Sequence, residues 1–315
     1  MLSMTTSTTS DARHLLGASD NELSALKRNG FIDRLFETTT RLFALFVLLL
    51  LGAILASLVV SGWPALQTFG LDFFTIDRWA ANIEKFGALP AVYGTLITSL
   101  IAIVIAVPVS FGIAIFLTEK CPVMLRRPLG ITVELLAGVP SIIYGMWGVE
   151  VLAPFLQSHF PTLFPAGTGL ATAGLILAVM IIPFITAITR DVMVTVPPIM
   201  RESAYGLGCT TWEVVRSVIF PSVRGGLVGG VILGLGRALG ETMAVTFVIG
   251  NNLFFHATLT GQGTSIAALI ANQFPEADGI QRSALLALGL LLFVITFIVL
   301  AIARLMLNRY DRKSA

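Results

Sequence analysis

Six long apolar stretches leave this chain few folds other than a bundle of membrane-spanning helices. A helix needs about 20 apolar residues to cross the hydrocarbon core of a bilayer, because each residue advances it by about 1.5 Å. Stretches of this length lie at about 42–62, 93–118, 129–152, 169–190, 225–250 and 284–306. Only 12% of the 315 residues are charged, about half the share in soluble domains. The sequence therefore predicts an all-α integral membrane protein with six transmembrane helices.

Lysine and arginine are distributed unequally between the two sides of this predicted bundle. With the N-terminus inside, the inner segments carry 16 of the 20 basic residues, and the outer segments carry Arg78, Lys85 and Arg282. Basic residues accumulate on the cytoplasmic side of membrane proteins. We therefore expect both termini to be cytoplasmic. The formal net charge of +2 reflects this topology, so we expect no nucleic-acid partner.

The chain divides into three parts by composition. Residues 1–41 are predicted to form a cytoplasmic extension, in which a capping box at residues 19–22 begins a short helix that breaks at Asn29-Gly30. An apolar helix along the membrane surface would follow. Residues 42–308 form the transmembrane domain, and residues 309–315 form a cytoplasmic tail.

Cysteine and histidine are too scarce to suggest a disulfide or a metal site. Cys121 and Cys209 both fall on the predicted cytoplasmic side, where thiols stay reduced. The three histidines, His14, His159 and His256, are far apart and have no metal-ligand spacing.

The fifth apolar stretch carries a permanent positive charge and a carboxylate, Arg237 and Glu241. An arginine near the bilayer centre costs about 2.5–3.5 kcal/mol on insertion scales. In a continuous helix Glu241 would lie one turn further on the same face and would offset part of this cost as an ion pair. The pair is either a structural salt bridge or the charged lining of a path for a polar or anionic solute, and we favour the path. Glu134, in the third stretch, is a further acid expected to face inward and to take part in substrate translocation with Arg237 and Glu241.

The same stretch contains a row of glycines. Gly226, Gly230 and Gly234 recur every four residues, and Arg237 and Glu241 continue the series. Small residues at this spacing let a neighbouring helix approach closely. The row therefore predicts a helix contact that keeps the charged pair away from lipid.

Prolines interrupt three neighbouring stretches, at Pro108, Pro140 and Pro183. Proline removes a backbone donor, which a bilayer tolerates where protein or a water-filled cavity satisfies the freed carbonyl. Three such sites favour a transport domain over an inert anchor.

The segment 191–224 between the fourth and fifth stretches is predicted to form two short cytoplasmic helices. Proline suits the first helical turn, so the first helix should begin near Pro198, and it should end at Gly206 or Gly208. A capping box at Thr210 should open the second helix, which we expect Pro221 to stop. Such a compact knob suits a cleft on a cytoplasmic partner.

This segment resembles the EAA loop of ABC-importer permeases. That signature reads Glu-Ala-Ala, three residues, Gly, nine residues and Ile-x-Leu-Pro. The chain has Glu202-Ser203-Ala204, then Gly208, then Val218-Ile219-Phe220-Pro221, with the same spacing. The three departures, Ser203, Val218 and Phe220, leave the expected helix–glycine–helix shape unchanged.

Four further motifs narrow the resemblance. They are Tyr93-Gly94-Thr95-Leu96, Val107-Pro108-Val109-Ser110-Phe111-Gly112, the run Pro140-Ser141-Ile142-Ile143-Tyr144-Gly145-Met146-Trp147-Gly148, and the block from Gly234 to Val245 around Arg237 and Glu241. Together they resemble the C-type permease of the bacterial phosphate-specific (Pst) ABC transporters, over about residues 41–308.

The resemblance implies a type I importer permease with a MetI-like fold in the bacterial inner membrane, translocating inorganic phosphate. It implies a homologous A-type permease as partner, two ATPase subunits and a periplasmic phosphate-binding protein. In that family the intramembrane arginine and glutamate are tied to phosphate passage, and they map onto Arg237 and Glu241. Coupling to the ATPase maps onto Glu202, Ser203, Ala204, Gly208 and Pro221. A permease of the same fold for sulfate or molybdate stays open.

The chain is not expected to hydrolyse ATP. A phosphate-cradling loop ends in Gly-Lys-Ser/Thr, and the four lysines follow Leu26, Glu84, Glu119 and Arg312. ATP and magnesium would therefore be bound by partner subunits, and we expect no cofactor in this chain. A membrane enzyme would need more acids, histidines or cysteines at one membrane face. A secondary transporter should show two related halves, which this chain lacks.

Overall fold

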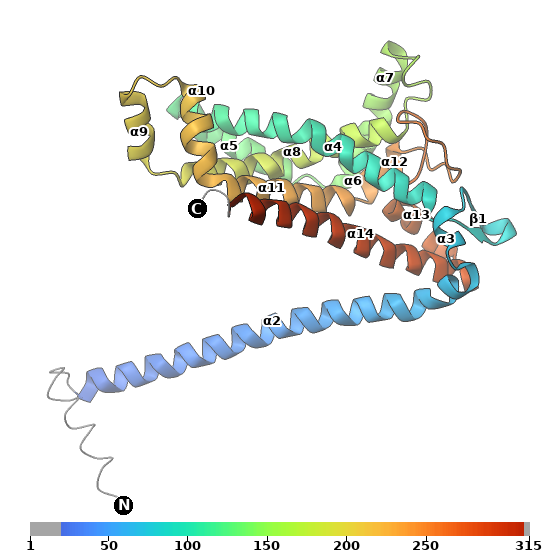
Figure 1. The fold of residues 1–315 in the computed structure, drawn as a ribbon, viewed down its shortest axis with the longest axis horizontal. Coiled ribbons are helices and arrows are strands. Elements are labelled where there is room, and N and C mark those ends of the chain that lie inside the picture. The colour runs from blue at the N-terminus through green and yellow to red at the C-terminus, as the bar shows by residue number, and fades with distance from the viewer. Residues whose placement is uncertain (1–19, 312–315) are drawn as a thin grey trace, which may run out of the picture. The chain divides into compact units, whose positions relative to one another are not determined.

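A computed structural model describes residues 20–311 of the chain, and the side chains of residues 33–305. The first residue of the predicted capping box lies outside these limits. The structure consists of helices, five short 3-10 or π turns and one small hairpin (Figure 1). The helices are α2 (Asp20–Phe69), α3 (Asp72–Thr75), α4 (Leu89–Ile115), α5 (Val123–Ala137), α6 (Ser141–Trp147), α7 (Ala153–His159), α8 (Leu170–Val194), α9 (Pro198–Gly206), α10 (Thr211–Val214), α11 (Phe220–Leu239), α12 (Met243–Val248), α13 (Ile266–Gln273) and α14 (Gly279–Asp311).

The chain forms two compact units, Met1–Ser57 and Leu58–Ala315. In the first unit α2 is continuous through Asn29-Gly30, so the break predicted there is wrong. A glycine inside a helix costs only about 1 kcal/mol, which is too little to interrupt a helix of 50 residues. From Leu42 to Leu51 nearly every apolar side chain of α2 is exposed within its unit.

The second unit is built around α8. Of the apolar window of this helix 61% is buried, compared with 28% for the window of α4 and 22% for that of the helix leading into α11. The three helices pack against one another, and α14 runs beside α11 (Figure 1). The core between them consists of small and branched residues, including Ala102, Ala106, Ile176, Ile181 and Ile185. A hydroxyl also joins two helices, because Ser110 donates a hydrogen bond to the carbonyl of Ile182 at 3.1 Å.

Five described helices are long and apolar enough to cross a membrane, at Asp33–Phe69, Leu89–Lys120, Leu170–Val194, Thr211–Leu239 and Gly279–Leu305. The predicted third span is instead a bent pair, Val123–Ala137 and Ser141–His159, whose axes differ by 88°. The break falls at Gly138–Pro140, where the sequence predicts an interruption. Pro108 and Pro183 lie inside α4 and α8 without breaking them. Residues 20–311 therefore contain six candidate spans if the bent pair counts as one.

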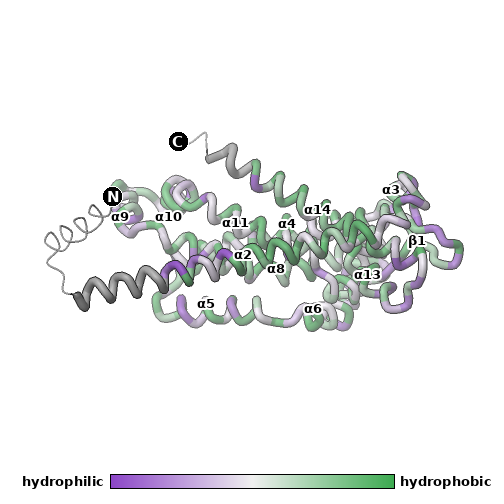
Figure 2. Tube along the Cα trace, turned by 90° about the horizontal axis from the view of Figure 1, so that it is seen from below, coloured by the Kyte–Doolittle hydropathy of each residue, from purple (hydrophilic) through white to green (hydrophobic). Residues whose placement is uncertain are grey.

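One end of the second unit is closed by the hairpin β1 (Trp79–Ala80) and β2 (Lys85–Phe86), which are antiparallel with Trp79 opposite Phe86. Trp79 and Phe86 are buried with Phe73, and the indole of Trp79 donates a hydrogen bond to Gln273 at 3.0 Å. Figure 2 shows hydrophobic colour along α4 and α8 and hydrophilic colour around β1. The polar residues thus gather beyond the apolar helices.

Candidate functional site

The helix that carries Arg237 ends earlier than predicted. Residues 225–250 do not form one helix, because α11 ends at Leu239 and α12 begins at Met243. The carboxylate of Glu241 lies in this break and accepts a hydrogen bond at 3.3 Å from the N–H of Ala244, in the first turn of α12. Arg237 is consequently in the last turn of α11, and Glu241 does not continue its helical face.

The predicted contact of the glycine row is confirmed. A Cβ atom at Gly234 would lie 2.7 Å from Cγ1 of Ile185, and one at Gly230 would lie 3.1 Å from Cγ2 of Ile188. Gly226 is closer still to Val192, whose side chain a Cβ atom there would overlap. As the numbers rise along α11 they fall along α8, so the two helices are antiparallel. Because the two helices approach so closely, Arg237 lies beside the next residues of α8.

Arg237 rests on the face of an aromatic ring. Its Cζ atom lies 4.1 Å from the ring centroid of Phe184, on α8. The guanidinium is partly buried, and its Nε atom is buried without a hydrogen-bond partner. The ion pair predicted between Arg237 and Glu241 is not among those found over residues 33–305. The cation is therefore stabilised by the ring face, while its N–H donors lie in the plane of the guanidinium.

A second helix break is close to the first. Gly145 of α6 faces α12 so tightly that a Cβ atom there would lie 2.9 Å from Cα of Ala244. The hydroxyl of Tyr144 donates to the carbonyl of Leu136 at 2.9 Å and so ties α6 back to α5 across the bend. The phenol of Tyr144 is also within electrostatic range of Arg237.

Sequence reasoning missed two members of this site, Tyr144 and Phe184. Tyr144 lies inside the motif Pro140–Gly148, which gave no reason to select it. Phe184 follows Pro183, and this adjacency was the one available signal.

Glu134 lies elsewhere. Its Oε1 atom is 2.7 Å from Nη2 of Arg190, which also contacts Asp191 at 2.7 Å. Gly130, one turn before Glu134, makes room for this arginine, because a Cβ atom there would lie 2.6 Å from Nη1 of Arg190. The structure thus uses Glu134 to join α5 to α8 and does not bring it to Arg237.

The EAA-like loop (residues 191–224) forms most of the predicted local structure. The first helix, α9, begins at Pro198, and Gly208 follows it with φ +85°. This left-handed conformation is the one expected for a glycine after a helix. The capping box is present: Thr210 accepts a hydrogen bond from the N–H of Glu213, whose carboxylate accepts one from the N–H of Thr210.

Pro221 does not stop the second helix, contrary to the prediction. It occupies the first turn of α11, where a helix needs no backbone donor. The helical path is continuous from Thr211 to Leu239, through a π turn at Val215–Ile219 and a kink at Val223. The loop is therefore joined to the Arg237 site by a kinked helical path.

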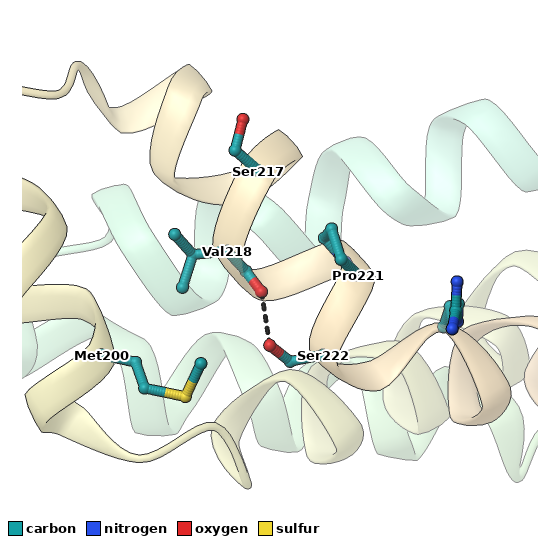
Figure 3. A pocket seen from close by; sticks show the side chains of 6 residues that line it. Met200, Ser217, Val218, Pro221 and Ser222 are labelled. Carbon is teal, nitrogen blue, oxygen red and sulfur yellow. Dashed lines mark hydrogen bonds between the residues drawn. The ribbon is translucent and has the colours of Figure 1, made fainter. Parts of the chain in front are cut away.

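The EAA-like residues face in different directions. Glu202 and Ser203 are exposed, whereas Ala204 is buried against Val214, Val215 and Ile219. Several large apolar side chains of the same loop are also exposed, namely Ile199, Met200, Tyr205, Leu207 and Trp212. Figure 3 shows a pocket beside them, in which Met200 of α9 reaches toward Ser222, and Pro221 forms another part of the lining. The Ser222 hydroxyl donates to the carbonyl of Val218 at 2.6 Å.

The profile of one protein family matches residues 110–312 of the chain. The family is described as "Binding-protein-dependent transport system inner membrane component". The phosphate transport system permease protein PstC of Mesorhizobium japonicum is 55% identical over 309 residues, which cover 92% of this chain and 94% of that protein. The protein of the same name from Pasteurella multocida is 54% identical, covering 90% and 93%.

Solved structures agree with the fold. A chain of a bacterial alginate ABC transporter, in complex with an alginate-bound periplasmic protein, superposes with a TM-score of 0.61 at 17% identity. The match covers 88% of this chain and 98% of the other. A chain of the MetNI methionine ABC transporter gives a TM-score of 0.50 at 21% identity, over 69% and 93%. The predicted importer-permease fold is confirmed.

Proposed function

The chain belongs to the family of binding-protein-dependent transport system inner membrane components, and from this premise we propose that it is the permease subunit through which an ATP-driven importer moves inorganic phosphate. Relatives that are 50–55% identical over nine tenths of the chain carry the name of phosphate permeases. This level of similarity does not favour sulfate or molybdate as the substrate. The observation that carries the proposal is the guanidinium of Arg237, held between two helix breaks with a buried donor that lacks a partner.

Arginine suits a phosphate path because it stays protonated when it is partly desolvated and its planar fork donates two hydrogen bonds to one anion. Stacking on Phe184 occupies a face of the guanidinium and leaves its edge available. A buried donor without a partner costs about 1–3 kcal/mol, which a passing phosphate oxygen would recover. We name Arg237, Glu241, Tyr144 and Phe184 the anion site, and we propose that it binds phosphate transiently.

Glu241 limits how strongly phosphate binds. Its carboxylate is held at the first turn of α12, so a fixed negative charge lies a few residues from Arg237. We propose that this charge repels the anion and keeps capture reversible. Glu134 contributes to the path indirectly, by holding α5 on α8 through Arg190.

The subunit works within an assembly. We propose a homologous A-type permease, two ATPase subunits and a periplasmic phosphate-binding protein as partners. The exposed apolar residues of this loop would contact an ATPase subunit, and we propose that this subunit binds the ATP and magnesium. The exposed apolar side chains of α2 and α5 would meet lipid or the partner permease.

Topology follows from the bent pair. If α5 and the helix Ser141–His159 cross together, the chain has an even number of spans and both termini lie on the same side. Only an even number of spans places the segments rich in lysine and arginine on the same side of the membrane. We therefore propose that both ends are cytoplasmic in the bacterial inner membrane.

The proposal is tested by uptake of radiolabelled phosphate in cells whose own phosphate importers are deleted and which express the complete transporter. Wild-type chain should support ATP-dependent uptake that excess unlabelled sulfate or molybdate leaves unchanged. Arg237→Gln should abolish it at equal membrane levels of the protein. Competition by sulfate as strong as that by phosphate would refute the substrate, and uptake by Arg237→Gln at the wild-type rate would reduce the arginine to a structural role.

A further inference from the structure

A buried ion pair attaches the first helix of the EAA-like loop to the transmembrane body. Arg201, on α9, directly precedes the exposed Glu202. Its Nη1 atom lies 3.4 Å from Oε1 of Glu119, in the π turn Phe116–Lys120 that follows α4. Only 6% of the Glu119 side chain is exposed, so this carboxylate is almost completely removed from solvent.

The same guanidinium reaches a third element. Nη2 of Arg201 donates a hydrogen bond at 2.6 Å to the carbonyl of Met193, in the last turn of α8. Ala204, three residues after Arg201, is buried on the same side of α9, whereas Glu202 faces outward. One side chain thus connects α9 to the ends of both α4 and α8.

Stability alone does not account for this pair. A buried ion pair is a weak source of stability, because removing two charges from water costs about as much as their attraction returns. Here the contact is longer than a good hydrogen bond, and Nε of Arg201 and Oε1 of Glu119 have no hydrogen-bond partner. Apolar residues of the same size would fill the space at lower cost. The pair does, however, fix the position of α9 on two helices.

We propose that Arg201 and Glu119 are positioning residues through which movement of α9 is passed to α4 and α8. The segments on either side of α9 contain Pro197 and the left-handed Gly208, and neither is helical. Without a direct link α9 could shift while the spans stayed in place. With it, a shift of α9 pulls on the Met193 end of α8, the helix that also carries Phe184 beneath Arg237.

This inference rests on the proposed function, since it assumes an ATPase that moves α9. The experiment uses the complete transporter, purified with its partner permease and ATPase subunits and reconstituted in liposomes with the binding protein. The measured quantity is phosphate transported per ATP hydrolysed, together with co-purification of the subunits. A merely structural role would lower transport and ATP hydrolysis together and leave their ratio unchanged.

Arg201→Met should leave the complex assembled and lower the ratio at least about tenfold. Glu119→Gln, which keeps the size and removes the charge, should lower it as well. The double variant should be no worse than the more damaged single variant, because both changes remove the same link. Arg127→Met is the matched control: this arginine is exposed on α5, outside the EAA-like loop, and the ratio should stay at the wild-type value.

An unchanged ratio in assembled Arg201→Met transporter would overturn the inference, as would a double variant whose loss is the product of the two single losses. If Arg201→Met does not assemble, Glu119→Gln decides in the same way. Wild-type transporter that hydrolyses ATP without moving phosphate would refute the proposed function instead, and the inference with it.

Discussion

Replacing Gly145 by alanine tests whether the packing of α6 on α12 positions the anion site. A Cβ atom at Gly145 would lie 2.9 Å from Cα and 3.1 Å from the carbonyl oxygen of Ala244. Both are backbone atoms, so no change of side-chain rotamer relieves the contact. Because carbon atoms pack at about 3.5–4.0 Å, the two helices must separate locally by about 0.6–1.1 Å.

The cost in stability should be small compared with the effect on transport. Overpacking of this kind costs about 1–3 kcal/mol, and alanine in place of glycine in a helix returns about 1 kcal/mol. The net loss of about 0–2 kcal/mol is smaller than the stability of a typical folded domain. A shift of about 1 Å in a positioned group, in contrast, can lower activity about 100-fold. We therefore predict a loss of phosphate uptake of at least about tenfold at a nearly normal protein level.

The assay is the initial rate of radiolabelled phosphate uptake, divided by the amount of permease in the membrane. Gly112→Ala is the matched control, because Gly112 is also a helical glycine but a Cβ atom there meets nothing within 4 Å. Its uptake should equal that of the wild type. Equal uptake by the Gly145→Ala and Gly112→Ala proteins would show that the α6–α12 contact does not position the site.

Three further predictions follow from the site, the loop and the topology. Arg237→Lys should lower phosphate uptake strongly, because lysine keeps the charge but loses the bidentate fork. Glu241→Gln should lower uptake less than Arg237→Lys does, and the reverse order would refute these roles. Gly208→Val should insert in the membrane but lose ATP-driven uptake, because the left-handed backbone at φ +85° suits glycine and not valine. Gly206→Val is the control, since a Cβ atom there also meets nothing within 4 Å, and it should lower uptake less. Equal loss of uptake in the two variants would show that the left-handed backbone of Gly208 is not the cause. A cysteine at Arg309 should resist impermeant maleimide in intact cells, and labelling from outside would refute a cytoplasmic C-terminus.

Much of this architecture could be predicted because it depends on local patterns. Apolar length located the spans, and the four-residue spacing of Gly226, Gly230 and Gly234 predicted a close helix contact that α8 provides. The Thr210 capping box and the left-handed Gly208 follow from chemistry within a few residues. Such features need no knowledge of the rest of the chain.

The anion site depends on contacts that a local pattern does not contain. Apart from Arg237, Glu241 and Thr242 the apolar stretch continues across Gly240, so its length gave no reason to end α11 there. The break is stabilised by the packing of Gly145 on Ala244 and by the Glu241 carboxylate at the start of α12. Phe184, the residue that supports Arg237, is more than fifty positions away in the sequence. Pro221 was misread because proline both stops one helix and suits the first turn of the next.

The kink at Val223 divides the helical path from Thr211 to Leu239 into two arms. The arm beyond the kink contacts α8 closely at three positions in a row, Gly226, Gly230 and Gly234. Three such contacts oppose a tilt of this arm, but they leave a smooth face along which it can slide over α8. A push from the loop would then move Arg237 along α8 by the same distance as Val223. A slide of about 1 Å covers the range over which a hydrogen bond to an anion is made or lost.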